Sequence, residues 1–429
     1  MTDLPSVPAP VAVRAELSAG ETAVDDLLTA AHLLAAHQLP GLLAEHGRRL
    51  GVGEVVVYLA DLQEQVLVPF VGPDEIGHGE TVGQVIIDAT LAGRAYQQLQ
   101  LQLQDLLGGR RRLWLPMLDG SERLGVLSVV LSGQDAQDSP ELLVRLQRFA
   151  SLAAELVMTK TMYGDTIVRL RRTQTMGLAA EMQWSLLPPL TFACHAVTIA
   201  AALEPAYEVA GDTVDYAVDA RRARLGIFDG MGHGLQSAQL AALTIAAYRN
   251  ARRADRNLTD TARSMDEALL AGFGGEAFTT AVIAELDTDT GLLQWVSAGH
   301  PEPLLMRDGK LVKTLHVEPA LPLGLGDSAD PTGLADPIAV GSEHLQPGDR
   351  VLFYTDGVTE ARSPDGDFFG PERLVDLLGR NLAGGLPTPE TMRRVVRALL
   401  GHKQAQLTDD ATLLLLEWHS GNEQALLPG

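Results

Sequence analysis

The stretch LGIFDGMGHG, Leu225 to Gly234, carries the strongest structural signal in this sequence. Its apolar first half predicts a buried β-strand. The strand stops at Asp229, and three glycines, a methionine and a histidine follow within five residues. Aspartate and glycine are ordinary turn formers, so a tight turn is one interpretation. The other is that a charged group comes very close to the main chain, which glycine allows because it has no Cβ.

Length and composition restrict the class of protein. The 429 residues suffice for two or three domains, and 46% hydrophobic with 21% charged residues indicates a globular chain. A net charge of −22 disfavours nucleic acid as a partner. The single cysteine, Cys194, excludes an internal disulfide and a thiolate metal site. Without a signal peptide or a run of about 18 apolar residues, we expect a cytoplasmic protein with no membrane insertion.

The N-terminal part is expected to be an α/β/α domain. Residues 1–20 predict a flexible lead-in, and residues 21–158 alternate helical and strand-like segments. Within them, VGQVIIDATLAGRAYQQL (82–99) is predicted as one helical segment. The segments GQVIIDATLAGRAY, LGVLSVVLS and ELLVRLQRFASLAAELV resemble a GAF sensor domain. The resemblance implies a ligand pocket or a dimer surface and leaves the small-molecule or protein signal unknown.

A long helix is expected to follow this domain. From Pro140 to Leu187 the apolar residues keep a helical spacing, with one interruption at Gly164–Asp165. We assign residues 159–194 as a linker or switch helix. Such a helix either pairs with a copy of itself or packs along its own domain. We favour the first alternative, a homodimer.

The C-terminal part has a different pattern of predicted secondary structure. Residues 195–418 contain strand-like segments joined by short polar turns and interrupted by two pairs of helices. This pattern predicts an antiparallel β-sandwich with helices on its outer faces, an αββα arrangement. The whole chain is therefore expected to be α+β, with a tail at 419–429.

Aspartates mark the ends of strands in this predicted sandwich. Asp212 begins a strand, Asp229 and Asp356 end two others, and Asp409 and Asp410 precede the last. Any one of them could be a turn former. Strand ends can share a rim, however, and converging carboxylates repel one another unless a cation neutralises them. Oxygen ligands favour Mg²⁺ or Mn²⁺ over Zn²⁺.

The motifs around these aspartates resemble those of metal-dependent PPM-type serine/threonine phosphatases. The most similar branch is the bacterial one of stage II sporulation protein E and the sigma-regulator phosphatases. The resemblance covers about residues 175–418 and includes the entering segment MQWSLLPPL. The motifs occur in the family's order along the chain: EVAGD, IFDGMGHG, FTTAVIAELD, VSAGHPEPLLM, LPLGL, LQPGDRVLFYTDGVTEA and DDATLLLLE.

The resemblance assigns roles to particular residues. It implies that Asp229 bridges two Mn²⁺ or Mg²⁺ ions, with the Gly230 carbonyl assisting one of them. It also implies that Asp356 and Asp409 hold the other ion, and that Asp212 acts on the second site directly or through water. Four further residues are secondary candidates for the site: His233, Asp410, Asp215 and His300.

The resemblance also implies a function. The expected reaction is hydrolysis of phosphoserine or phosphothreonine by direct attack of water, without a covalent enzyme intermediate. The expected substrate is a STAS-type anti-anti-sigma factor in sigma-factor regulation, with the GAF-like domain as regulator. The alternative is a catalytically weak or inactive phosphatase-fold sensor that docks a partner. Loss of metal carboxylates would mark that alternative, and all four principal aspartates are present.

Overall fold

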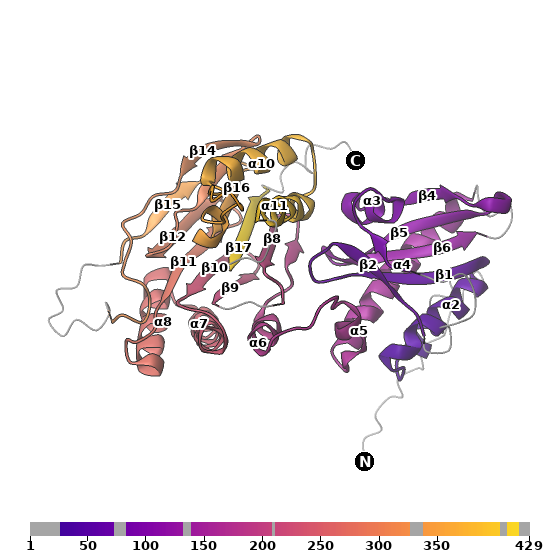
Figure 1. The fold of residues 1–429 in the computed structure, drawn as a ribbon, viewed down its shortest axis with the longest axis horizontal. Helices are drawn as coiled ribbons and strands as arrows, with labels where there is room; N and C mark the ends of the chain where they lie inside the picture. Colours follow the sequence, from indigo (N-terminus) through magenta and orange to yellow (C-terminus); the bar gives the residue numbers. More distant parts are fainter. Residues whose placement is uncertain are drawn as a thin grey trace, which may run out of the picture. The chain divides into compact units, whose positions relative to one another are not determined.

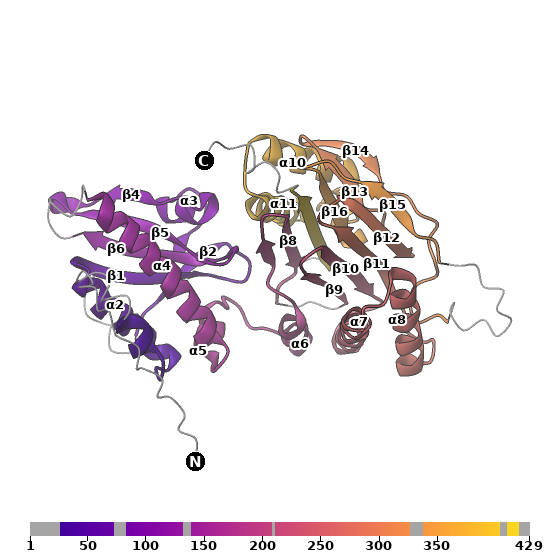
Figure 2. The same cartoon turned by 180° about the vertical axis from the view of Figure 1, so that it is seen from behind.

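The computed structural model describes residues 26–72, 83–131, 139–207, 211–326, 338–403 and 410–419. The predicted lead-in (1–20), Asp409 and all of the predicted tail except His419 lie outside these residues. The chain forms two compact units that divide between Arg171 and Arg172, apart from the turns 62–64 and 120–122. Figures 1 and 2 show the two units, which are described separately below.

The first unit contains a six-stranded antiparallel sheet in the order β3-β2-β1-β6-β5-β4. Its strands are β1 (Val52–Ala60), β2 (Val66–Phe70), β3 (Val85–Ile86), β4 (Gln102–Asp105), β5 (Arg111–Asp119) and β6 (Glu122–Leu131). Its helices are η1 (Ala36–Gln38), α2 (Leu39–Arg49), α3 (Leu91–Gln98), η2 (Leu107–Gly109), α4 (Pro140–Thr161) and α5 (Asp165–Leu170), preceded by helical residues 26–31.

Helices cover both faces of this sheet, as the α/β/α expectation requires (Figure 1). On one face, Leu43 of α2 and Phe149 of α4 join a core with Leu127 of β6. On the other, Tyr96 of α3 packs in a core with Trp114 of β5 and Val126 of β6. Apolar side chains on both faces of a strand give near-continuous apolar runs such as Leu124–Leu131.

The predicted helix over 82–99 is wrong in its first half. Val85 and Ile86 form strand β3, which pairs with β2, and helix α3 begins only at Leu91. Thr90 caps it, since its side chain accepts a hydrogen bond from the Gly93 amide. The β-branched residues before the cap therefore extend the sheet edge instead of the helix.

The long helical pattern after Pro140 is broken twice. The predicted interruption at Gly164–Asp165 is confirmed, because Gly164 is the N-cap of α5. A second break, over 171–177, separates α5 from α6 (Leu178–Leu186). In this break, Tyr207 provides the hydrogen-bond acceptors for two backbone amides. Its hydroxyl accepts from the Thr173 amide, and its carbonyl accepts from the Gly177 amide.

The second unit contains two antiparallel sheets, one of five strands in the order β15-β12-β11-β10-β9 and one of six in the order β14-β13-β16-β17-β8-β7. The five-stranded sheet consists of β9 (Asp212–Val218), β10 (Arg222–Gly230), β11 (Thr279–Asp287), β12 (Leu292–Ala298) and β15 (Gly341–His344). The six-stranded sheet consists of β7 (Thr191–Ala193), β8 (Val197–Glu204), β13 (Leu304–Arg307), β14 (Lys310–Thr314), β16 (Arg350–Tyr354) and β17 (Ala411–Trp418).

The two sheets pack face to face, with Ile227, Trp295, Phe353 and Leu414 among the residues buried between them. Helices α7 (Leu235–Arg253) and α8 (Leu258–Phe273) pack on the outer face of the five-stranded sheet. Helices α10 (Pro371–Ala383) and α11 (Thr388–Lys403) pack on the outer face of the other, as Figure 2 shows. The predicted αββα sandwich and the α+β class are confirmed. None of the helices in the described ranges is long and apolar enough to cross a membrane.

Candidate active site

Two of the predicted site residues lie directly opposite each other. Asp212 begins β9, Asp229 lies near the end of β10, and the two are paired in the antiparallel register. Residues in such a pair have Cβ atoms about 4.5–5.5 Å apart. Val214 and Ile227, two positions further along each strand, belong to the core between the sheets. Because side chains alternate along a strand, both carboxylates lie on the face that meets the second sheet.

The Asp212 carboxylate is deeply buried, with 2% of the residue exposed. Its Oδ2 accepts a hydrogen bond of 2.7 Å from the Thr355 hydroxyl, at the end of β16 in the other sheet. Burial raises the pKa of Asp212 well above its usual range, and the neighbouring Asp229 and Asp410 carboxylates raise it further. The site thus concentrates negative charge that no described cationic side chain neutralises at Asp212.

Asp410 and Asp356 lie at the start of β17 and just after β16. The Asp410 Oδ2 accepts hydrogen bonds from the amides of Gly211 (2.7 Å) and Asp212 (3.3 Å). Asp356 is exposed and begins the short helix α9 (Asp356–Thr359). A Cβ added to the next residue, Gly357, would lie 1.8 Å from the Asp410 carbonyl oxygen. The strand ends that carry Asp212, Asp356 and Asp410 therefore meet at one edge of the sandwich.

The glycines of the stretch Leu225–Gly234 and the facing Gly211 allow close backbone packing. Gly230 donates its amide to the Gly211 carbonyl at 3.1 Å. A Cβ on Gly211 would lie only 2.0 Å from the Gly230 carbonyl oxygen, so this close approach excludes any side chain there. Gly232 and Gly234 adopt φ angles of 91° and 81°, which glycine takes at little cost. Tight backbone packing therefore accounts for part of the glycine-rich stretch, in addition to any role near charge.

The residues present fit a divalent cation. Buried adjacent carboxylates are costly unless a cation is bound, and the raised pKa of Asp212 reflects that cost. Among the described residues, no three His, Cys, Asp or Glu side chains already form a cluster able to hold an ion. Asp409, the remaining predicted ligand, falls outside those residues.

The secondary candidates are placed differently. The Asp215 carboxylate accepts from Arg249 at 2.7 Å and lies 2.9 Å from Arg252, both on α7. Since it lies three positions after Asp212 in β9, it projects toward the helices, away from the Asp212 face. His233 is exposed, beside the start of α7.

His300 is buried, with 6% of the residue exposed. Its Nδ1 is hydrogen-bonded to the Thr280 hydroxyl at 2.7 Å, and Thr280 pairs with Asp229 in the β10–β11 register. Burial lowers the pKa of His300 to about 3, although a backbone hydrogen bond with Tyr354 opposes this. A histidine that stays neutral suits a positioning role next to the Asp229 strand.

Two residues of the site were missed by the sequence interpretation. Thr355 joins three strands, because its hydroxyl also accepts from the Thr412 amide at 2.9 Å. The threonine at the end of the apolar run VLFYTD was an available signal. Gln183 of α6 is 1% exposed and donates its side-chain amide to the Asp212 carbonyl oxygen. The polar residue within MQWSLL, otherwise apolar on that face, was the corresponding signal.

Comparisons with known proteins agree with the motifs. The family model described as stage II sporulation protein E (SpoIIE) matches residues 219–419. The phosphoserine phosphatase RsbU of Bacillus subtilis is 25% identical over 240 residues, covering 56% of this chain and 68% of RsbU. The protein IcfG of Synechocystis sp. is 29% identical over 138 residues, covering 32% of this chain.

The alignments thus span 68% of RsbU and only 20% of IcfG. Among solved structures, the SiaA-PP2C domain of Pseudomonas aeruginosa is similar, with a TM-score of 0.46 and 22% identity. That similarity covers 56% of this chain and 94% of the SiaA-PP2C chain. Residues 219–419 therefore match the stage II sporulation protein E family, in agreement with the bacterial PPM-type phosphatase branch that the motifs resemble.

Proposed function

We propose that this chain is a metal-dependent protein phosphatase that hydrolyses phosphoserine or phosphothreonine in a protein substrate. The observation that carries the proposal is the pairing of Asp212 with Asp229 on the inner face of β9 and β10. The Asp410 charge and the Thr355 hydroxyl of the opposite sheet adjoin this pair. The family match and the name of the RsbU relative support the same reaction.

The proposed ligands are Asp212, Asp229, the Gly230 carbonyl, Asp356 and Asp409, and the proposed cofactors are two Mn²⁺ or Mg²⁺ ions. When bound, such ions lower the pKa of a water and stabilise charge that develops on a phosphoryl group. The chain itself holds the carboxylates in place: Thr355 fixes the Asp212 side chain, and Asp410 fixes the backbone from which it projects.

The proposed substrate is a phosphorylated STAS-type anti-anti-sigma factor, within sigma-factor regulation. Residues 21–158 act as a GAF-like sensor, residues 159–194 as the linker to the phosphatase domain (195–418), and the chain acts as a cytoplasmic homodimer. The contact of Gln183 with the Asp212 carbonyl supports a route by which a displaced α6 alters the site.

Hydrolysis of p-nitrophenyl phosphate tests the catalytic proposal. We expect turnover by the full chain with Mn²⁺, none with chelator, and a loss of at least about a hundredfold in Asp229→Asn. Asp219→Asn is the matched control, because Asp219 is exposed in the turn between β9 and β10, at the opposite end of this strand pair. Near-normal turnover by Asp229→Asn would contradict the proposal and favour the docking-module alternative.

A further inference from the structure

We infer that the first unit holds a binding site for a small amphipathic organic acid, centred on Lys160. A cavity of about 750 Å³ lies between residues 28–37 and the segment from Leu156 to Thr166. Its size falls within the range typical of small-molecule sites. Every lining residue belongs to the first unit, so the inference does not depend on the proposed phosphatase activity.

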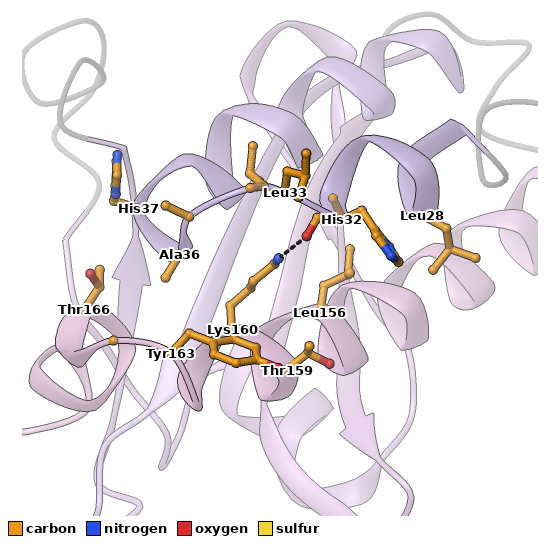
Figure 3. Close-up of a pocket in the computed structure, with 14 residues that line it drawn as sticks. Leu28, His32, Leu33, Ala36, His37, Leu156, Thr159, Lys160, Tyr163 and Thr166 are labelled. Atoms are coloured by element: carbon orange, nitrogen blue, oxygen red, sulfur yellow. Dashed lines mark hydrogen bonds between the residues drawn. The ribbon is translucent and has the colours of Figure 1, made fainter.

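Lys160 is the polar group that defines the ligand's charge. It is 7% exposed, and Figure 3 shows its side chain extended across the middle of the cavity. Its Nζ donates one hydrogen bond, of 3.4 Å, to the His32 carbonyl. Among the described residues it forms no ion pair, whereas an ammonium group can donate three hydrogen bonds. A buried charge is costly unless it is paired, so the cavity is suited to an anion at this point.

The rest of the cavity suits an apolar body. Leu28, Ala36 and Leu156 line it, as Figure 3 shows. At its rim, Leu33 is 98% exposed and Tyr163 is 80% exposed. A ligand that covers these apolar side chains removes them from water, which favours binding. His32 and His37 also line the cavity and add hydrogen-bonding groups for a carboxylate.

The combination specifies the ligand class. One carboxylate, or a sulfonate in its place, lies against the Lys160 Nζ, and an alkyl or aromatic body lies against the leucines. A strongly hydrated polyanion such as a nucleotide does not match, because only one cationic side chain in the described part of the cavity is buried.

Two dyes that differ in one charged group test this assignment on the full chain. 8-Anilinonaphthalene-1-sulfonate carries the anion and the apolar body, and N-phenyl-1-naphthylamine lacks the sulfonate. We expect saturable fluorescence with the anionic dye and its displacement by decanoate. Lys160→Met should weaken the binding of the anionic dye at least about tenfold and change the affinity for the neutral dye less than about twofold. Lys160→Arg should bind both dyes as the parent does.

Two further variants serve as controls. Lys310→Met removes a lysine charge from the exposed strand β14 and should leave the affinity for both dyes unchanged. Ala36→Phe should weaken the binding of both dyes, because the larger side chain fills the cavity. Thermal unfolding followed by circular dichroism monitors the fold, and the Tm of Lys160→Met should equal or exceed that of the parent, since a costly buried charge is removed.

Three results would overturn the inference. One is the absence of saturable binding of the anionic dye, as when the chain's own residues fill the cavity. Another is unchanged binding of that dye to Lys160→Met. The third is a clear drop in the Tm of Lys160→Met with equal loss of both dyes, which would make Lys160 a structural residue that supports His32.

Discussion

Asp212 and Asp229 face each other across β9 and β10, and the Asp212 carboxylate is held by a threonine from the opposite sheet. The pairing places two negative charges side by side in a largely buried position. Such an arrangement is unfavourable for the protein alone and favourable for a bound cation.

Asp212→Asn should stabilise the metal-free protein while abolishing phosphatase activity. The folded-state pKa of Asp212 is raised by burial and by its acidic neighbours, so its ionisation at neutral pH opposes folding. We expect a gain of about 1 kcal/mol in the free energy of unfolding in chelator. Asp219→Asn, with its exposed carboxylate, should show no gain.

The same substitution has a defined pH dependence. Because the folded pKa is raised, the contribution of Asp212 to stability is present below its unfolded pKa of about 3.9 and is lost as pH rises through the folded value. The Tm difference between Asp212→Asn and the parent should therefore grow from pH 4 upward in chelator. A difference that shrinks with rising pH would contradict the raised pKa.

Thr355→Val should reduce activity through misplacement of Asp212. The change keeps the side-chain shape but removes the hydroxyl that donates to Asp212 Oδ2 and accepts from the Thr412 amide. Leaving these buried partners unsatisfied should cost about 1–3 kcal/mol of stability. Steady-state kinetics with p-nitrophenyl phosphate should show a lower kcat/KM, and Thr355→Ser should restore it. Failure of serine to restore activity would exclude the hydroxyl as the cause.

Gln183→Ala should raise the Mn²⁺ concentration needed for half-maximal activity. The variant leaves the Asp212 carbonyl without its side-chain donor and loosens the packing of α6 against the start of β9. We expect a shift of about tenfold, which corresponds to one lost buried hydrogen bond. Gln346→Ala, at an exposed position, is the matched control and should leave the Mn²⁺ dependence unchanged.

Gly211→Ala should destabilise the second unit strongly. Its Cβ would lie 2.0 Å from the Gly230 carbonyl oxygen, so strand β10 would have to move. We expect a loss of about 3 kcal/mol or more, measured by denaturant unfolding. Gly401→Ala is the control, because a Cβ there meets no atom within 4 Å and α11 should gain up to about 1 kcal/mol. Similar effects of both substitutions would argue against the close contact.

His300→Asn should leave the shape of the pH–rate profile between pH 5 and 9 unchanged. Burial lowers the pKa of His300 to about 3, so the ring is neutral throughout this range. Its folded pKa is depressed, and its contribution to stability is therefore lost as pH falls below the unfolded value of about 6.5. The variant should lose less stability than the parent between pH 7 and 4, whereas His195→Asn, at an exposed position, should behave like the parent. A vanished limb of the rate profile would instead identify His300 as a titrating catalytic group.

Local patterns in the sequence predict the α+β class and the αββα sandwich of the second unit. In the segment DTDTG (287–291), whose composition is typical of a turn, the amides of Asp289 and Thr290 donate to Asp287 Oδ1 between β11 and β12. The errors occur where long-range pairing decides. Val85 and Ile86 form an edge strand only because β2 offers them partners. Tyr207 satisfies backbone donors in the break before α6 from a distant position in the chain.

The sequence by itself determined the chemistry available to this protein: carboxylates at the ends of apolar strands, glycines where backbone must approach backbone, and the ordered motifs of a phosphatase family. Only the tertiary structure decided which of these groups meet. Asp212, Thr355 and Asp410 come from three strands in two sheets, and their contacts depend on strand register and on how the sandwich closes. Register depends on hydrogen bonds between residues far apart in the chain, which local propensity does not encode.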